Sequence, residues 1–98
     1  MIYGMYAVRD SATRQYMSIL TDINDDCAMR NFDMAVLNND VIHFRPSDFS
    51  LYKLGSYDSG TGKVVSCPPE CLRLGTESEV FLDGRSNVQN DFGSEEDN

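Results

Sequence analysis

The side chains best suited to binding a metal ion are three cysteines and the single histidine: Cys27, His43, Cys67 and Cys71. Cys67 and Cys71 have the close spacing that structural zinc sites use. The other two potential ligands are far apart in the sequence, whereas such sites normally take their ligands in two close pairs. We therefore expect three free thiols, buried or at the surface, and no metal site.

Two further segments could suggest catalysis or phosphate binding. No Ser, Cys or Asp near His43 forms a recognisable catalytic dyad with it, so a packed, hydrogen-bonded histidine is the expected role. The loop Gly60-Thr61-Gly62 followed by Lys63 has the glycines of a phosphate cradle. It lacks the spacing of a P-loop and a helix N-terminus to receive phosphate, so these glycines are interpreted as turn residues. The sequence predicts neither an enzyme nor a cofactor.

A third constellation is aromatic. Six rings fall on expected strands: Tyr3, Tyr6, Tyr16, Phe49, Tyr52 and Tyr57. Because side chains alternate along a strand, some of these rings must point away from a helix packed on the sheet. Exposed tyrosines beside basic residues could stack single-stranded bases, and they are equally compatible with a dimer interface. The nucleic-acid-binding candidates are Tyr6, Tyr52, Tyr57, Arg9, Arg14, Arg45, Lys53 and Lys63.

The elements that must position these residues begin with a hairpin and a helix. Residues 2–8 and 16–20 are rich in β-forming residues, with turn residues at 10–13. Asn24 is a suitable N-cap for a helix of about 14 residues, near the average length. The apolar side chains of this helix recur at helical spacing: Ala28, Met29, Phe32, Ala35 and Val36.

A second hairpin follows the helix. Residues 41–44 could form a short strand or a packed loop, which Arg45-Pro46 would close. Residues 49–57 and 63–67 are expected strands around a five-residue loop, and Cys67-Pro68-Pro69 is expected to end the second strand. Residues 70–74 could form a helical turn or an edge strand. The order ββαββ predicts an α+β domain over residues 1–76, with the helix on one face of an antiparallel sheet.

Negative charge is concentrated near the C-terminus. The formal net charge is −8, and residues 77–98 carry seven acids and one arginine, so most of the excess lies there. Low hydrophobicity from residue 83 onward predicts a disordered acidic tail, which could lie over a basic groove and compete with phosphate. The start of the chain lacks the features of a signal peptide, and no apolar run could span a membrane. A cytoplasmic protein without membrane contact is expected.

The sequence also resembles a known family. The resemblance covers roughly residues 3–63: a Tyr-Ala-Val-Arg-Asp-Ser strand and turn, then Ala-Met-Arg-Asn-Phe on the helix, then Pro-x-Asp-Phe-x-Leu-Tyr-x-Leu-Gly from Pro46 to Gly55. This order is similar to that of the small nonstructural protein of gokushoviruses, which are microviruses with circular single-stranded DNA genomes.

Membership of that family implies a protein made in the bacterial cytoplasm that assists viral single-stranded DNA synthesis or packaging. It implies binding to viral single-stranded DNA or to the viral replication complex, and it supplies no catalytic residues. A homo-oligomer is also expected, because a small domain with an uncovered aromatic sheet face is suited to pairing with itself. The alternative is a protein adaptor or homodimeric module that acts on a viral or host protein without contacting DNA.

Overall fold

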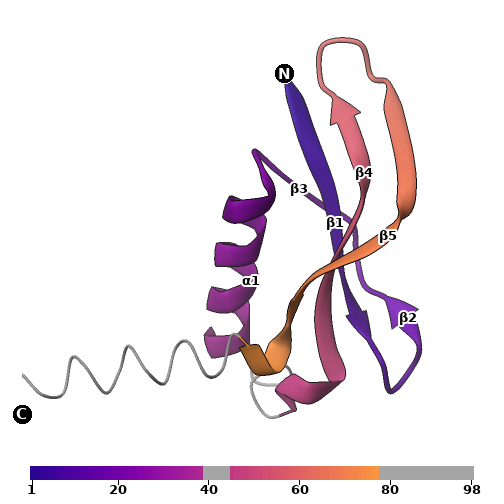
Figure 1. The fold of residues 1–98 in the computed structure, drawn as a ribbon. Coiled ribbons are helices and arrows are strands. Elements are labelled where there is room, and N and C mark those ends of the chain that lie inside the picture. Colours follow the sequence, from indigo (N-terminus) through magenta and orange to yellow (C-terminus); the bar gives the residue numbers. More distant parts are fainter. Residues whose placement is uncertain (39–44, 78–98) are drawn as a thin grey trace, which may run out of the picture.

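An antiparallel sheet with one helix packed on one of its faces forms the described part of the chain, residues 1–38 and 45–77 of a computed structural model (Figure 1). The strand order is β2-β1-β4-β5, and β3 also pairs with β1. The elements are β1 (Ile2–Asp10), β2 (Gln15–Tyr16), β3 (Leu20–Asp22), α1 (Asp25–Asn38), a 3-10 turn at Pro46–Asp48, β4 (Phe49–Asp58) and β5 (Val64–Leu74). The predicted α+β fold is confirmed.

The first hairpin is less regular than predicted. Its return segment is divided into β2 and β3, which pair with β1 at Arg9↔Tyr16 and Tyr6↔Leu20. Between them the Met17 amide donates to the Val8 carbonyl at 2.8 Å, so the segment stays beside β1 without forming one continuous strand. The predicted single strand over residues 16–20 is therefore wrong in detail, although its position at the edge of the sheet follows from the hairpin.

The helix begins and ends close to where its sequence signals predict. The Asn24 side chain accepts a hydrogen bond from the Cys27 amide at 2.8 Å, which satisfies one of the free donors of the first turn. The apolar stripe of α1 meets the sheet in one core, whose buried members are Tyr6, Ala28, Phe32, Val36, Phe49 and Leu51. Val8, Met29 and Leu72 pack against this core. The predicted helix of 14 residues is confirmed.

The second hairpin is longer than predicted. β5 continues to Leu74, so the expectation that Cys67-Pro68-Pro69 ends the strand is wrong. Pairing with β4 shifts register between Lys53↔Glu70 and Gly55↔Ser66, which places the prolines in a bulge. β5 is an edge strand, and proline is tolerated on edges and in bulges because its missing amide donor leaves no ladder bond unmade. The predicted alternative of an edge strand over residues 70–74 is correct.

Two predicted segments fall on residues that the structure does not describe. The segment from 41 to 44, which contains His43, lies outside the described residues, as does the disordered acidic tail predicted from residue 83 onward. Within the described ranges, no helix is long and apolar enough to cross a membrane. The last described residue, Glu77, accepts a hydrogen bond from the Leu74 amide at 2.7 Å.

Candidate nucleic-acid interface

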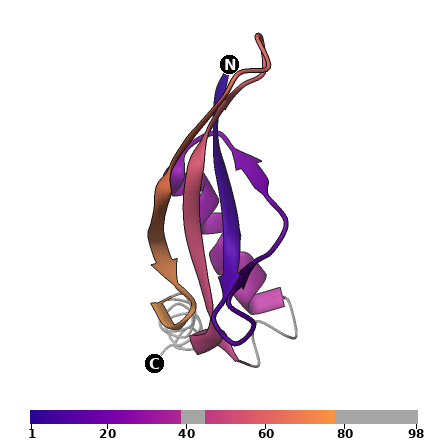
Figure 2. The same cartoon turned by 90° about the vertical axis from the view of Figure 1, so that its right-hand side faces the viewer.

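The two faces of the sheet differ in what covers them. The Tyr6 and Val8 side chains of β1 point into the core under α1, so alternation directs Tyr3, Met5, Ala7 and Arg9 to the opposite face. Figure 2 looks onto that side, where β5, β4 and β1 lie side by side and the described helix lies behind them. We call this side the open face. It comprises Tyr3, Met5, Ala7, Arg9, Tyr16, Tyr52 and Tyr57.

An aromatic cluster lies at one end of the open face. The rings of Tyr16 and Tyr52 meet edge to face with centroids 5.5 Å apart and an interplanar angle of 89°. The Arg9 guanidinium lies 5.9 Å from the centroid of the Tyr16 ring, within range of a cation–π contact. Ala7 pairs directly with Tyr52 and is fully buried. Its small methyl side chain leaves room for the neighbouring rings. We call Arg9, Tyr16 and Tyr52 the aromatic cluster.

A second pair of rings lies farther along the same face. Tyr3 and Tyr57 are direct cross-strand partners, four residues along β1 from Ala7. Both are half-buried, so each ring keeps exposed surface. Tyr52 and Tyr57 are an odd number of residues apart, and they share a face only because the register of β4 shifts at Leu54, between Lys53 and Gly55. The bulge therefore aligns two groups of tyrosines on one surface.

Two further arginines lie at the end of the sheet that carries the aromatic cluster. Arg14 is exposed in the β1–β2 turn, with a left-handed φ of 61°, and Arg45 is exposed just before the 3-10 turn. These two turns are joined, because the Ser11 amide donates to the Asp48 carbonyl at 2.8 Å. Arg9, Arg14 and Arg45 thus lie toward one end of the molecule, whereas Lys63 is exposed at the opposite end.

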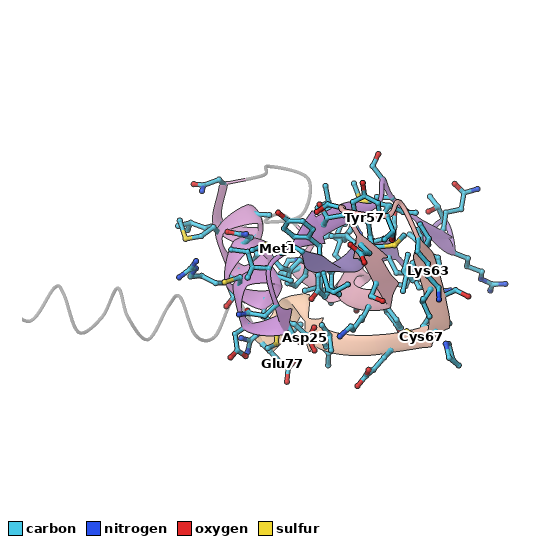
Figure 3. The ribbon with its side chains drawn as sticks, turned by 90° about the horizontal axis from the view of Figure 1, so that it is seen from above. Met1, Asp25, Tyr57, Lys63, Cys67 and Glu77 are labelled. Atoms are coloured by element: carbon cyan, nitrogen blue, oxygen red, sulfur yellow. The ribbon has the colours of Figure 1, made fainter. Side chains whose placement is uncertain are left out.

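Tyr6 and Lys53, two of the predicted binding residues, lie on the other face. Tyr6 is 1% exposed, and its hydroxyl donates to Asp25 at 2.7 Å. The Lys53 ammonium lies 3.0 Å from the same carboxylate. Neither side chain is on the open face, and the Tyr6 ring is too deeply buried to stack on a base. Figure 3 shows Asp25, the first residue of α1, and Lys63 farther from the helix.

The contacts of Asp25 perturb two titrations. Burial, with the hydrogen bond to Asp25 second, raises the pKa of Tyr6 far above its ordinary value. The hydrogen bond from Tyr6, followed by that from Lys53, lowers the pKa of Asp25. The tyrosine is therefore neutral and the carboxylate ionised over the whole physiological range, which is the combination that the hydrogen bond needs.

A cavity of about 550 Å³ opens beside this network, at the N-terminal end of α1. Its lining includes Asp25, Asp26, Tyr6, Lys53 and Ile2. The Lys53 ammonium is already paired with Asp25, so the two carboxylates leave the lining with a net negative charge. Phosphate would be repelled there, and the cavity is a poor site for the nucleic-acid backbone.

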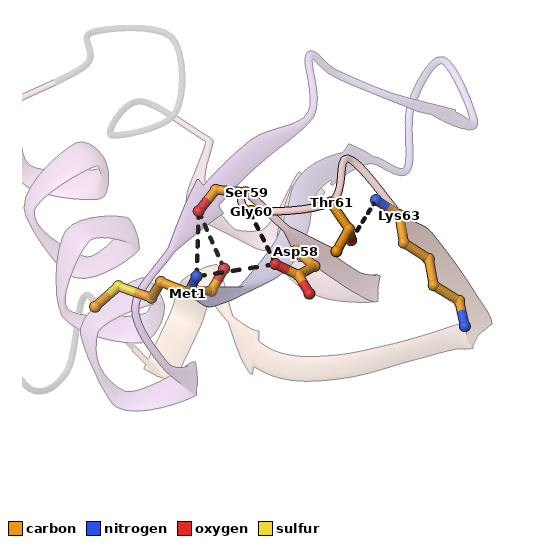
Figure 4. Close-up of polar contacts among 6 residues, drawn as sticks. All are labelled: Met1, Asp58, Ser59, Gly60, Thr61 and Lys63. Atoms are coloured by element: carbon orange, nitrogen blue, oxygen red, sulfur yellow. Dashed lines mark hydrogen bonds and ion pairs between the residues drawn. The ribbon is translucent and has the colours of Figure 1, made fainter.

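The loop between β4 and β5 uses its polar atoms internally (Figure 4). Asp58 accepts a hydrogen bond from the Gly60 amide at 2.9 Å and lies 3.9 Å from the N-terminal ammonium. The hydrogen bond from Gly60 is the main reason why the pKa of Asp58 is lowered. The Thr61 hydroxyl accepts from the Lys63 amide at 3.2 Å. Gly62 has a left-handed φ of 77°, which favours glycine. The glycines therefore shape a turn, as predicted from the sequence.

The cysteines are free thiols, as expected: Cys27 is half-buried, and Cys67 and Cys71 are exposed on β5. Among the residues that the structure describes, no three His, Cys, Asp or Glu side chains gather in a way that could hold a metal ion. His43, the remaining ligand considered in the sequence, is outside the described residues.

Fold and surface together define a small α+β domain whose antiparallel sheet is covered by a helix on one face and presents tyrosines on the other. The chain belongs to the phage ORF5 protein family, because the family profile described as "Phage ORF5 protein" matches residues 3–79, most of the chain. No curated protein and no solved structure matches the chain significantly.

Sequence reasoning omitted two residues of this surface from the binding candidates. Tyr3 and Tyr16 were identified as strand aromatics, but their positions gave no reason to prefer them over Tyr6. The available signal was parity along β1: once Tyr6 and Val8 are assigned to the core, Tyr3 must face the other way. The place of Tyr16 depends on its pairing with Arg9, which spacing alone does not determine.

Proposed function

We propose that this phage protein binds single-stranded DNA on the open face. The observation that carries the proposal is the aromatic cluster, in which two tyrosines and an arginine lie together on a sheet surface that no described helix covers. Tyrosine rings stack on any base, at about 1–3 kcal/mol per base, and a neighbouring arginine adds attraction to the phosphate backbone. This combination suits binding without sequence preference.

The spacing of the tyrosines indicates a short footprint. Four residues of β1 separate Ala7, under the aromatic cluster, from Tyr3 in the second pair, which corresponds to about 13 Å along the strand. A strand that stacked on both groups would span a few nucleotides. That length is near the lower end of the roughly 4–16 nucleotides that single OB-fold domains occupy.

The charge of the chain sets an upper limit on the electrostatic part of the binding. Among the described arginines at the end with the aromatic cluster, Arg73 is paired with Asp33 of α1, which leaves Arg9, Arg14 and Arg45. The chain as a whole has a net charge of −8. With about three phosphates neutralised, a plot of log K against log salt concentration would have a slope of about −2. Affinity would therefore depend more on stacking than in a strongly basic protein.

The resemblance to the gokushovirus nonstructural protein gives this activity its proposed setting. The protein would assist viral single-stranded DNA synthesis or packaging in the bacterial host cytoplasm, by holding the displaced or newly made strand. The proposal includes no catalytic step. The rival role is that of an adaptor, in which the open face contacts the viral replication initiator, another protein or a second copy of the chain.

Fluorescence anisotropy of a labelled oligothymidylate, titrated with the full chain at several salt concentrations, tests the proposal. We expect saturable binding that weakens with salt at the slope given above. Arg9→Gln should reduce the slope by about 0.7, as the loss of one phosphate contact predicts for a single strand. Arg30→Gln is the matched control, because it makes the same charge change on the exposed side of α1.

Two results would contradict DNA binding by the open face. If Arg30→Gln weakened binding as much as Arg9→Gln, binding would reflect overall charge and the open face would not be the site. If the wild-type chain bound no oligonucleotide at low salt but captured the replication initiator in the absence of DNA, the adaptor role would replace the proposed one.

A further inference from the structure

The edge of the sheet formed by β2 and β3 exposes an unusual amount of apolar surface. From Tyr16 to Thr21 the chain carries no charged side chain. The exposed fractions are 41% for Tyr16, 48% for Met17, 57% for Ile19, 57% for Leu20 and 62% for Ile23. We call these five residues the edge strip. Together they present on the order of 400 Å² of apolar surface, which is within the size range of the largest, often functional, apolar patch on a monomeric protein.

The opposite edge also exposes apolar side chains, at Val64, Val65 and Leu74, but it carries features that prevent pairing. β5 contains Pro68 and Pro69, which cannot donate hydrogen bonds to another strand, and two register shifts interrupt its pairing with β4. Glu70 and Arg73 add charge to it. Prolines, charges and bulges are the devices by which proteins prevent a sheet edge from pairing with another chain. Between Tyr16 and Thr21 the edge strip has no proline and no charge, and its one irregularity is a register shift of one residue on β1. The β2–β3 edge is therefore less protected than the β5 edge.

The charges at the two ends of the edge strip indicate which partner would fit. Arg14 precedes the strip and is exposed, whereas Asp22 lies just before its last residue and Asp26 follows it. If two copies paired antiparallel through this edge, the Arg14 end of each would face the Asp22–Asp26 end of the other. A parallel arrangement would place like charges together. The strip is thus self-complementary in the antiparallel sense only, as a twofold interface requires.

We propose that a second copy of the chain binds at the edge strip, with the two β2–β3 edges antiparallel about a twofold axis. This inference does not depend on DNA binding. In antiparallel pairing the twofold axis is perpendicular to the sheet, so the open faces of both copies point the same way. Their tyrosine groups would form one continuous surface, with the two DNA paths running in opposite directions.

The mass of the full chain in solution, measured by sedimentation velocity without DNA, provides the first test. We expect a concentration-dependent dimer in the wild type. Ile19→Lys introduces two charges across the twofold axis and should weaken dimerisation at least about tenfold. Val65→Lys is the matched control on the β5 edge, where the residue replaced is 50% exposed, and it should leave the dimer unchanged.

Charge exchange provides a second test that needs no apolar substitution, should Ile19→Lys fail to fold. Arg14→Glu should weaken the dimer roughly tenfold, because symmetry makes each substitution count twice. Adding Asp26→Arg to that variant should restore the dimer. Both residues are exposed, so circular dichroism should show the native fold in each variant.

Several outcomes would overturn the proposal. The wild type could be monomeric at every concentration, or Val65→Lys could be as disruptive as Ile19→Lys. Loss of the dimer in Tyr57→Ala would show that the copies meet through the open face instead. An unchanged mass in Arg14→Glu would exclude the antiparallel arrangement. None of these results bears on whether the monomer binds DNA, which the anisotropy titration decides separately.

Discussion

Each face of the sheet carries a tyrosine beside a basic residue, but only one of these pairs is available to a ligand. On the helix face, Tyr6 and Lys53 both contact the Asp25 carboxylate, at 2.7 and 3.0 Å. On the open face, Arg9 lies over the Tyr16 ring, which meets Tyr52. A residue type that suggests nucleic-acid binding is therefore structural on one side and free to act on the other.

The difference arises from the helix N-terminus. Asp25 is in the first turn of α1, where a carboxylate is favoured by the helix dipole and can reach across to the sheet. The lysine of the helix face is thereby neutralised, and the tyrosine becomes part of the core. The open face has no such carboxylate among the aromatic cluster, so its arginine retains its attraction for phosphate.

The largest expected effect separates the two faces by stability. Tyr6→Ala removes a fully buried ring and should lower the free energy of unfolding by about 3–5 kcal/mol. Tyr52→Ala removes a half-buried ring from the open face and should cost less than about 2 kcal/mol. Urea unfolding followed by circular dichroism measures both values. Equal losses in the two variants would contradict the assignment of Tyr52 to an uncovered surface.

The next effect separates the faces by binding. Tyr52→Ala should weaken oligothymidylate binding about 10- to 100-fold, since stacking supplies about 1–3 kcal/mol per base. Tyr6→Phe is the control, because it keeps the buried ring and removes only the hydroxyl that donates to Asp25. Its affinity should equal that of the wild type. Loss of binding in Tyr6→Phe would move the site to the helix face.

The pH dependence of stability should originate on the helix face. The lowered pKa of Asp25 stabilises the fold above about pH 4, and this contribution is lost as the pH falls through the folded-state pKa. The raised pKa of Tyr6 stabilises the fold below about pH 10, and this contribution is lost as the pH rises further.

Thermal unfolding across this pH range can be compared with that of Asp25→Asn, which should flatten the acid limb. The change should be under about 1 kcal/mol, because the Asp25 side chain is 41% exposed. Asp26→Asn, in the same helical turn, is the control. An acid limb that flattened equally in both variants would mean that the Tyr6–Asp25–Lys53 contacts are not its source.

The smallest expected effect concerns the acidic C-terminal residues. Removing residues 83–98 deletes a segment of net negative charge and should raise the affinity for single-stranded DNA a few-fold at low salt, with the gain disappearing as salt screens the charges. Parallel anisotropy titrations of the two chains measure this change. Unchanged affinity at low salt would show that the segment does not compete with phosphate for the open face.

Much of the fold could be predicted from local signals. The Asn24 cap, the apolar stripe ending in Val36 and the glycine-bearing loop at residues 58–62 each determine their structure through nearby contacts, and each was predicted. The continuation of β5 past Pro68 was not, because proline is excluded from a central strand but tolerated at an edge. Whether a strand is central or at an edge depends on the order of the whole sheet.

The proposed binding surface is harder to predict than the fold. Strict alternation along β4 assigns Tyr52 and Tyr57 to opposite faces, and only the bulge at Leu54 brings them together. Lys53 is a basic residue of the kind that binds phosphate. Its ammonium is instead paired with Asp25, which is distant in the sequence. Such pairings depend on tertiary packing, which residue types and spacing do not specify.

The central place of β1 in the sheet also determines when the protein can finish folding. β1 is made first, yet its long partner β4 pairs Ile2 with Asp58 and Asp10 with Phe49. During synthesis, β2, β3 and α1 can form beside β1, but the sheet must wait until β4 has left the ribosome. Pairing between distant segments slows folding. Until then Tyr6 and Phe32 lack Leu51 and Phe49 as packing partners, so the nascent chain passes through an interval in which its core is incomplete.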